Sequence, residues 1–409
     1  MTIQKQLLDQ MTASGRVADI AEFDDPVLGP LRLLPGTWEN TPLLNGFGFN
    51  LMALPFNNRP AGPRNMGFRV LMNQYEETLT FAVTDKGVPN RGRQADPSTG
   101  RDDQTIVALD YFQKIRQIDS DDFPASGLNE RFNGQLIHKE PGLWLHMVDH
   151  NTISPQGDIN IARLGTIPHG NSFLASGSVP NRKKSPEDED DFVLIRDPDE
   201  ADLLQLADNI IPGTNGAPLI PGINGVVVGG GENPEEKDLE PILDDDGNLI
   251  IDYFEAYRHF HEAPYQGKIP IKGFSGFEPV HTTDLLVHTL VNVLLPIGKV
   301  RRIMRLRVNS AVDHAGVTRT GHNGIVNIPF VVRQADANVM NATFIIYEIE
   351  DKKTGKLRHF MQYAQNVILD FIGRPDGHPN RARWPHVSIN TMERVEKTVS
   401  KELAKALLY

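Results

Sequence analysis

The stretch WPHVSINTMER, residues 384–394, decides the fold because polar and apolar residues alternate along it. Successive side chains of a β-strand point to opposite faces, so we expect His386 to share one face with Ser388 and Asn390, and Ile389 to lie on the other. If this strand belongs to a closed barrel, His386 points either into the cavity or out to water. The rest of the sequence decides between these two orientations.

Composition limits the functions that the chain can have. The 409 residues carry a formal net charge of −12 and include no cysteine. Nucleic acids and anionic membranes attract basic surfaces, so we expect neither as a partner. Disulfides, thiolate catalysis and cysteine-ligated metals are excluded. We find no signal peptide and no apolar run of the roughly 18 residues that a membrane helix needs, so we expect no membrane span and a cytoplasmic protein.

Short apolar runs separated by turn signals recur over residues 27–180 and again from residue 325. This rhythm is typical of an antiparallel barrel or sandwich. Between the two blocks the sequence is charged and rich in loops, with a buried helix expected over 280–297. Residues 300–308 alternate arginine with apolar residues and predict a strand whose basic face is solvated. Two domains joined by a linker, or one barrel with an insertion, both fit this order.

Seven short motifs follow one another in the two strand-rich blocks. They are GTW at 36–38 with Gly46 and Gly48, YEETLTF at 75–81, DYFQ at 110–113, HKEPGLWL at 138–145, IARLG at 161–165 with Gly177, MQYAQ at 361–365, and PHVSINTMER at 385–394. In this order they resemble the motifs of nitrobindin-like heme-binding β-barrels, relatives of the fatty-acid-binding proteins and lipocalins. One departure is Leu145, which occupies the place of an arginine in the family pattern.

The resemblance implies one mainly β protein, an antiparallel up-and-down, calycin-like β-barrel of about ten strands that a long mixed insertion interrupts. The expected segments are an N-terminal helix at 1–24, the first part of the barrel at 25–180, an insertion of loops and helices at 181–324 that could form a lid, the last barrel strands at 325–396, and a C-terminal helix at 397–409.

The resemblance also implies a cofactor, heme b, and its ligand. In the family, the histidine of the last strand is the proximal ligand of the iron, which corresponds here to His386. We expect Thr37, Ser388 and Asn390 to lie beside the cofactor.

Three further residues are candidates for catalysis. His138 and Glu140 share a strand face, where the carboxylate can orient the imidazole, and a purely structural hydrogen bond is the alternative. His146 joins that face if the register continues through Pro141. His169 lies in a tight turn, where mouth loops often carry ligand-binding residues, and an ordinary turn residue is the alternative.

The function expected from this resemblance is to act on or to sense a small oxidant such as peroxide, nitric oxide or peroxynitrite. A heme-dependent peroxidase, a peroxynitrite isomerase and a sensor all stay open. The alternative is a non-heme carrier of a small hydrophobic ligand, with residues 285–297 forming a lid or filling the heme space. A metal site at His259 and His261 is a weaker alternative, and a homodimer stays open. We find no nucleophile elbow, phosphate-binding loop or dinucleotide fingerprint.

Overall fold

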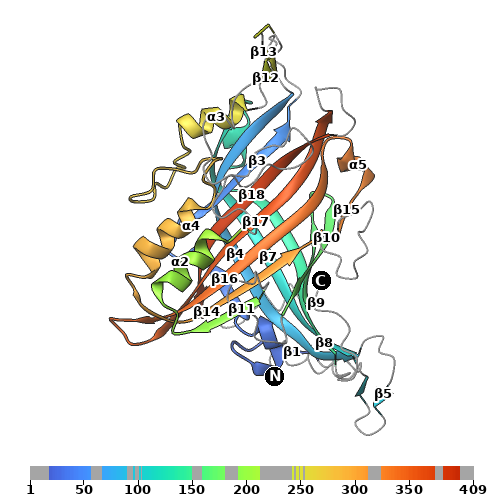
Figure 1. The fold of residues 1–409 in the computed structure, drawn as a ribbon, viewed down its shortest axis with the longest axis vertical. Helices are drawn as coiled ribbons and strands as arrows, with labels where there is room; N and C mark the ends of the chain where they lie inside the picture. The colour runs from blue at the N-terminus through green and yellow to red at the C-terminus, as the bar shows by residue number, and fades with distance from the viewer. Residues whose placement is uncertain are drawn as a thin grey trace.

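The computed structural model describes residues 18–56, 67–89, 95–96, 101–102, 104–149, 159–179, 192–211, 242–243, 246–247, 249–251, 254–311, 324–373 and 381–396. This part of the chain is mainly β, with few helices, and its long strands form one antiparallel sheet that closes on itself (Figure 1).

Ten strands form the ring, each paired with its neighbours in the order given. They are β14 (Gly298–Asn309), β16 (Asp336–Asp351), β17 (Leu357–Gly373), β18 (Arg381–Val395), β2 (Gly36–Glu39), β4 (Phe68–Pro89), β7 (Gln104–Phe123), β8 (Leu136–Asp149), β9 (Ile159–Ile167) and β10 (Asn171–Ser178). Ser176 of β10 pairs with Asn309 of β14 and closes the ring. Strand β3 (Gly48–Pro55) continues the position of β2 in the sheet. It pairs with the same neighbours, β18 and β4, further along those strands. The expected up-and-down barrel of about ten strands is confirmed.

The remaining elements are short. They are β1 (Ala18–Ile20), η1 (Pro26–Leu31), β5 (Ala95–Asp96), β6 (Arg101–Asp102), η2 (Asn129–Phe132), β11 (Phe192–Arg196), α2 (Glu200–Asp208), β12 (Ile242–Leu243), β13 (Leu249–Ile251), α3 (Glu255–Glu262), α4 (Asp284–Thr289), the π-helix η4 (Leu290–Leu294), β15 (Ile325–Asn327) and α5 (Pro329–Val332).

The barrel wall separates two hydrophobic cores. The inner core takes the inward side chains of all ten strands, among them Trp38, Trp144 and Phe344. The outer core lies between the wall and helices α2, α3 and α4, and includes Ile389 of β18 and Leu286 of α4. Burial of each such side chain is worth about 1.5–3 kcal/mol, so both faces of this part of the wall contribute to stability. The described helices of the middle segment therefore cover the outside of the barrel and do not fill it (Figure 1).

Two expected boundaries differ from the structure. Strand β14 is part of the ring although it lies inside the expected insertion 181–324, because its residues 304, 306 and 308 are apolar and point inward. Within the expected N-terminal helix 1–24, β1 is a strand that pairs with β4. The expected C-terminal helix at 397–409 lies outside the described residues.

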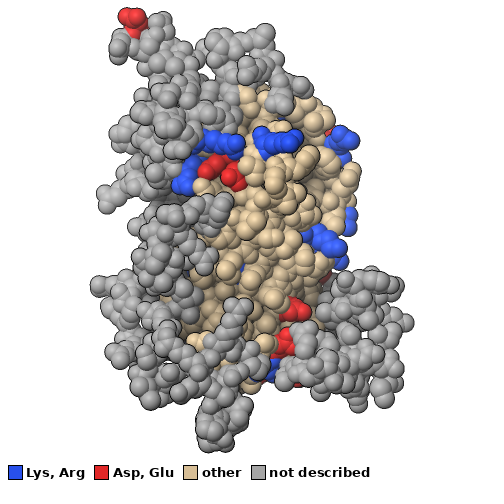
Figure 2. Space-filling model, turned by 90° about the vertical axis from the view of Figure 1, so that its right-hand side faces the viewer, with Lys and Arg blue, Asp and Glu red and all other residues tan. Residues whose placement is uncertain are grey.

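The opposite side of the barrel from the helices carries β15 and α5 (right-hand side of Figure 1). Figure 2 shows this side, with few charged side chains in its central part. Exposed apolar side chains on these elements are Val326 at 67%, Ile328 at 51% and Phe330 at 77%. The described surface on this side is thus partly apolar, although the whole chain carries a net charge of −12.

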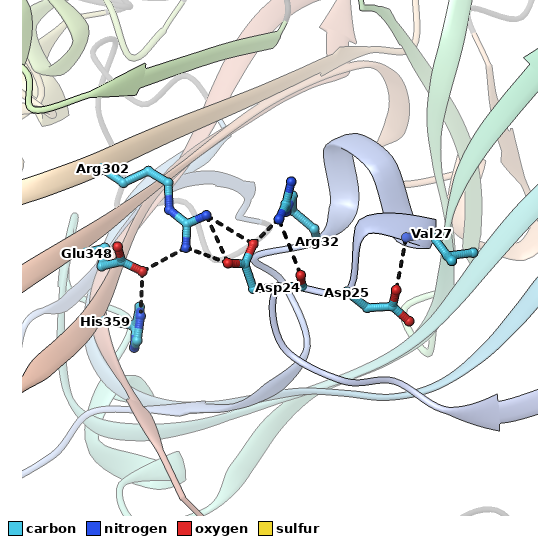
Figure 3. Close-up of polar contacts among 7 residues, drawn as sticks. All are labelled: Asp24, Asp25, Val27, Arg32, Arg302, Glu348 and His359. Carbon is cyan, nitrogen blue, oxygen red and sulfur yellow. Dashed lines mark hydrogen bonds and ion pairs between the residues drawn. The ribbon is translucent and has the colours of Figure 1, made fainter.

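The lower end of the barrel in Figure 1, where η1 lies, is closed by apolar side chains and an ion-pair network. Trp38 is fully buried and donates its indole N–H to the carbonyl oxygen of Leu34 at 2.8 Å. The Arg302 guanidinium binds Glu348 of β16 at 2.8 Å and Asp24 at 3.0 Å, and Glu348 also contacts His359 of β17 at 3.1 Å (Figure 3). The network ties the N-terminal segment to three barrel strands.

This network corrects the expectation of a solvated basic face over residues 300–308. Arg302 points inward, and Arg305 and Arg307 lie on the outer face, yet all three are buried. Arg307 donates to the carbonyl oxygen of Asn209, just after α2. An alternating basic and apolar strand looks the same in sequence whether its charges meet water or protein partners, so the pattern could not reveal this burial.

We predict that Arg302→Ala lowers the free energy of unfolding by about 3 kcal/mol, the low end of the range for a broken buried ion pair, because Asp24 is partly solvated. The neighbouring Arg301→Ala is the matched control. Arg302 is 7% exposed, whereas Arg301 is 40% exposed and pairs with exposed Asp197. Urea unfolding of the two variants should show a large loss for the first and little change for the second. Equal losses of the free energy of unfolding in the two variants would contradict the assignment of Arg302 to a buried ion-pair network.

Candidate functional site

The upper end of the barrel interior is built around His386. Its side chain lies on the inner face of β18, in register with Val367 of β17 and Met52 of β3. The inward residues His386 and Ser388 keep accessible surface, whereas Val387, which points outward, is fully buried under the outer core. Inward side chains at this end of the barrel are therefore partly accessible. The expectation that His386, Ser388 and Asn390 share a face is confirmed.

Three histidines from different elements meet near this position, and we call His138, His169 and His386 the histidine cluster. The rings of His138 and His169 lie 5.7 Å apart between centroids. Burial, with smaller contributions from the nearby His138 and His169, lowers the pKa of His386 to about 3. His386 is therefore a neutral imidazole at neutral pH. Its Nε2 has one weak contact, at 3.5 Å from the Ser388 hydroxyl oxygen.

Glu140 fixes the orientation of His138. The two side chains lie on one face of β8, with 3.3 Å between Oε2 of Glu140 and Nε2 of His138, as the sequence predicted. Burial alone would raise the pKa of Glu140, but the Arg163 guanidinium and His138 reverse the effect, and the pKa is lowered. Glu140 is thus an ionised carboxylate. It accepts a hydrogen bond from Nε2–H of His138.

Arg163 of β9 is the residue that the sequence analysis missed here. Its guanidinium donates to Glu140 at 2.8 Å, to Tyr111 at 3.2 Å and to Gln365 at 2.8 Å. It also lies 5.1 Å from the ring centroid of Phe344. The family pattern placed an arginine where Leu145 stands, but the guanidinium that reaches Glu140 comes from the next strand. Its position opposite Trp144 depends on the register between β8 and β9, which the sequence pattern does not show.

A second polar group lies below, around the buried Glu77 of β4. Tyr363 contacts Glu77 Oε2 at 2.6 Å, Gln113 donates to Oε1 at 2.7 Å, and Asn390 donates to Oε2 at 3.0 Å. Tyr75 lies 2.9 Å from the Tyr363 hydroxyl. We call these residues the Glu77 network. Asn390, which we expected beside the cofactor, is fully buried and uses its amide in this network.

Two glycines make room for the tyrosines of these polar groups. Gly48 is paired with Tyr75, and a Cβ at Gly48 would lie 2.5 Å from the tyrosine ring. Gly142 is likewise paired with Tyr111, and its Cβ would lie 2.5 Å from that ring. Distances this short require something to move. A side chain at Gly48 would therefore collide with the tyrosine ring that crosses it.

Other expected site residues lie elsewhere. Thr37 is on the outer face of β2, 3.4 Å from the hydroxyl of Thr80, and is not brought to the histidine cluster. His146 does share the inner face of β8, but it lies at the lower end against Gly29. His259 stacks on Phe123 on the outside of the barrel.

The proposed metal site at His259 and His261 is not formed. Both residues lie on helix α3 and not on a strand, and His261 contacts Glu278. Within the described residues, no three His, Asp or Glu side chains are grouped as ligands of a metal ion. In the same part of the chain, no helix has the length and hydropathy needed to cross a bilayer.

Comparisons with known proteins add little. No family model and no curated protein matches the chain. Among solved structures, the chain is similar to the crystal structure of Rv2717c from M. tuberculosis, with a TM-score of 0.30 and 9% identity, over 92% of this chain and 100% of that one. A likeness this distant carries no argument about function, so the case for a function depends on the geometry of the interior.

We predict that His386 makes the folded protein acid-sensitive. Its folded pKa of about 3 lies below the unfolded value of about 6.5, so the unfolded chain binds more protons in between, and stability should fall as pH falls from about 6.5 towards 3. Denaturant unfolding of the apoprotein across this range, compared with His386→Leu, measures the contribution. If the free energy of unfolding of His386→Leu changes with pH as steeply as that of the native protein, the low pKa of His386 is contradicted. NMR titration of the histidines measures that pKa directly.

Proposed function

We propose that the protein binds heme b at the upper end of its barrel, with His386 as the axial ligand of the iron. The observation that carries this proposal is the state of His386, which is an inward, partly accessible and neutral imidazole whose Nε2 has only a weak contact. Iron is bound by imidazole in this neutral form.

The side chains around His386 fit such a group in their chemistry. The inward residues Met52, Leu71, Ile115 and Val367 are apolar and keep accessible surface. They would lie against a flat apolar ring system and limit the access of water. Ser388 lies beside the ligand histidine, and His138 and His169 supply polar groups at the same end of the barrel.

Bound heme would supply an iron centre that reacts with small oxidants such as peroxide, nitric oxide or peroxynitrite. The chain itself would handle protons. The ionised Glu140 orients His138 through its Nε2, and Nδ1 is the ring atom that would exchange a proton with a small molecule nearby. His169 is exposed in the turn between β9 and β10 and would lie on the route by which a small molecule enters. We propose action on, or sensing of, such oxidants, with a peroxidase or peroxynitrite isomerase as the enzymatic forms.

A second candidate is a non-heme carrier of a small hydrophobic ligand. The same accessible apolar side chains, Met52, Leu71, Ile115 and Val367, favour it, because they would hold any apolar molecule of suitable size. Mass spectrometry of an organic extract from the purified protein detects such a ligand.

We predict that titration of hemin into the apoprotein produces a shifted Soret band that saturates at one equivalent, and that His386→Ala abolishes it. His288→Ala is the control, because His288 lies on α4 outside the barrel and should leave the band unchanged. A native protein that stays spectrally silent with hemin would remove the heme proposal. A saturable band that survives His386→Ala would remove His386 as the ligand.

A further inference from the structure

The Glu77 network contains three close oxygen–oxygen contacts in a line. The Tyr75 hydroxyl lies 2.9 Å from the carbonyl oxygen of Ile389 and 2.9 Å from the Tyr363 hydroxyl, which lies 2.6 Å from Glu77 Oε2. Each contact needs one hydrogen between its two oxygens. The carbonyl supplies none, and the two phenols supply one each. Burial raises the pKa of both phenols well above the ordinary value, so each keeps its hydrogen but has only one to give.

No neighbouring amide can supply the missing hydrogen, because the amide that faces Glu77 Oε2 is fixed in orientation. The backbone N–H of Glu77 donates to Oδ1 of Asn40, which sets which end of that amide is oxygen. Asn40 Nδ2 then donates to Asn390 Oδ1 at 2.9 Å. The Nδ2 of Asn390 must therefore face Glu77 Oε2, and its hydrogens are directed there and at Asn40.

We propose that Glu77 is a neutral carboxylic acid whose proton completes an ordered chain from Glu77 through Tyr363 and Tyr75 to the carbonyl oxygen of Ile389. With this proton in place, Glu77 donates to Tyr363, Tyr363 donates to Tyr75, and Tyr75 donates to the carbonyl. All three contacts then hold one hydrogen. An ionised Glu77 would accept the hydrogen bond of Tyr363. Only the hydrogen of Tyr75 would then remain for the other two contacts, and one of them would hold no hydrogen.

The surroundings of Glu77 agree with this count. Its side chain is buried, and its hydrogen-bond partners Gln113, Asn390 and Tyr363 carry no charge. Burial raises the pKa of Glu77, against the opposing effects of those hydrogen bonds and of His138. The titratable groups that face it are the phenols of Tyr75 and Tyr363 and the imidazole of His138, and none is an ion-pair partner within 4.0 Å in the described residues.

Glu140 is the natural contrast within the same barrel. It is equally buried, but the Arg163 guanidinium binds it directly and keeps it ionised. The two buried glutamates are therefore in opposite protonation states. This inference holds whether or not heme binds, because it concerns the apoprotein.

The test compares Glu77→Gln with Glu140→Gln in the apoprotein at neutral pH. Infrared spectroscopy should show the carbonyl stretch of a protonated carboxylic acid in the native protein and in Glu140→Gln, and its loss in Glu77→Gln. The melting temperature should fall clearly in Glu140→Gln, which leaves Arg163 without its carboxylate, and little in Glu77→Gln, which keeps a neutral group of the same shape.

The pH dependence gives a second readout with a defined sign. The folded pKa of Glu77 lies above the unfolded value, so its contribution to stability is complete at acid pH and is lost as pH rises through the folded pKa. As pH rises from the unfolded to the folded pKa of Glu77, the free energy of unfolding of the native protein should fall more steeply than that of Glu77→Gln. If the variant fails to fold, carbon-13 NMR titration of labelled glutamate in the native protein measures the pKa of Glu77 directly. A Glu77 carboxyl that titrates at the ordinary value, or an infrared spectrum without the acid band, would overturn the inference.

Discussion

The ion pair between Glu140 and Arg163 is the interaction on which the barrel interior depends. It joins β8 to β9, and Arg163 extends it to Gln365 on β17, across the interior. Two ions of this kind are costly to bury unless their remaining hydrogen-bonding groups are satisfied. Here Tyr111 and Gln365 satisfy the guanidinium, and Tyr111 and His138 satisfy the carboxylate. The orientation of His138, and through it the histidine cluster, follows from this arrangement.

The path of the middle segment follows from the composition of the strands that it covers. Strands β16, β17 and β18 carry buried apolar residues on their outer face, among them Ile345, Ala364 and Ile389. A wall of this kind would leave a large apolar surface in water, and monomeric proteins rarely expose one. Helices α2 and α4 bury it. The middle segment therefore acts as an outer layer of the barrel, and the interior is filled by the inner core, the polar groups and the histidine cluster.

The sequence predicted those features that depend on the period of a strand. Alternation placed His386 and Ser388 on one face and brought His138 beside Glu140, because side-chain direction repeats every two residues whatever the rest of the fold does. It could not predict Arg163 or Glu77 as members of the interior. Their roles depend on which strand lies beside which, and at what register. Residues 300–308 were correctly predicted as a strand, but the place of β14 in the ring and the burial of its arginines were not, because arginines suit a solvated strand as well as a buried one. Only the segments packed against the strand distinguish the two.

The contrast between the two buried glutamates shows how neighbouring strands set the charge of the interior. Glu77 and Glu140 are the same residue type, both inward and both buried, but within the described residues only Glu140 is bound by a guanidinium from an adjacent strand. A cation beside Glu77 would ionise it and break the order of hydrogens that runs to Ile389. With neutral amides and phenols around it, the protonated form satisfies more contacts at a lower cost in desolvation. The same balance keeps His386 neutral, since no carboxylate contacts it in the described structure. The upper end of the barrel thus presents a neutral imidazole at His386, above a glutamate that the hydrogen-bond count makes neutral and a glutamate that Arg163 keeps ionised.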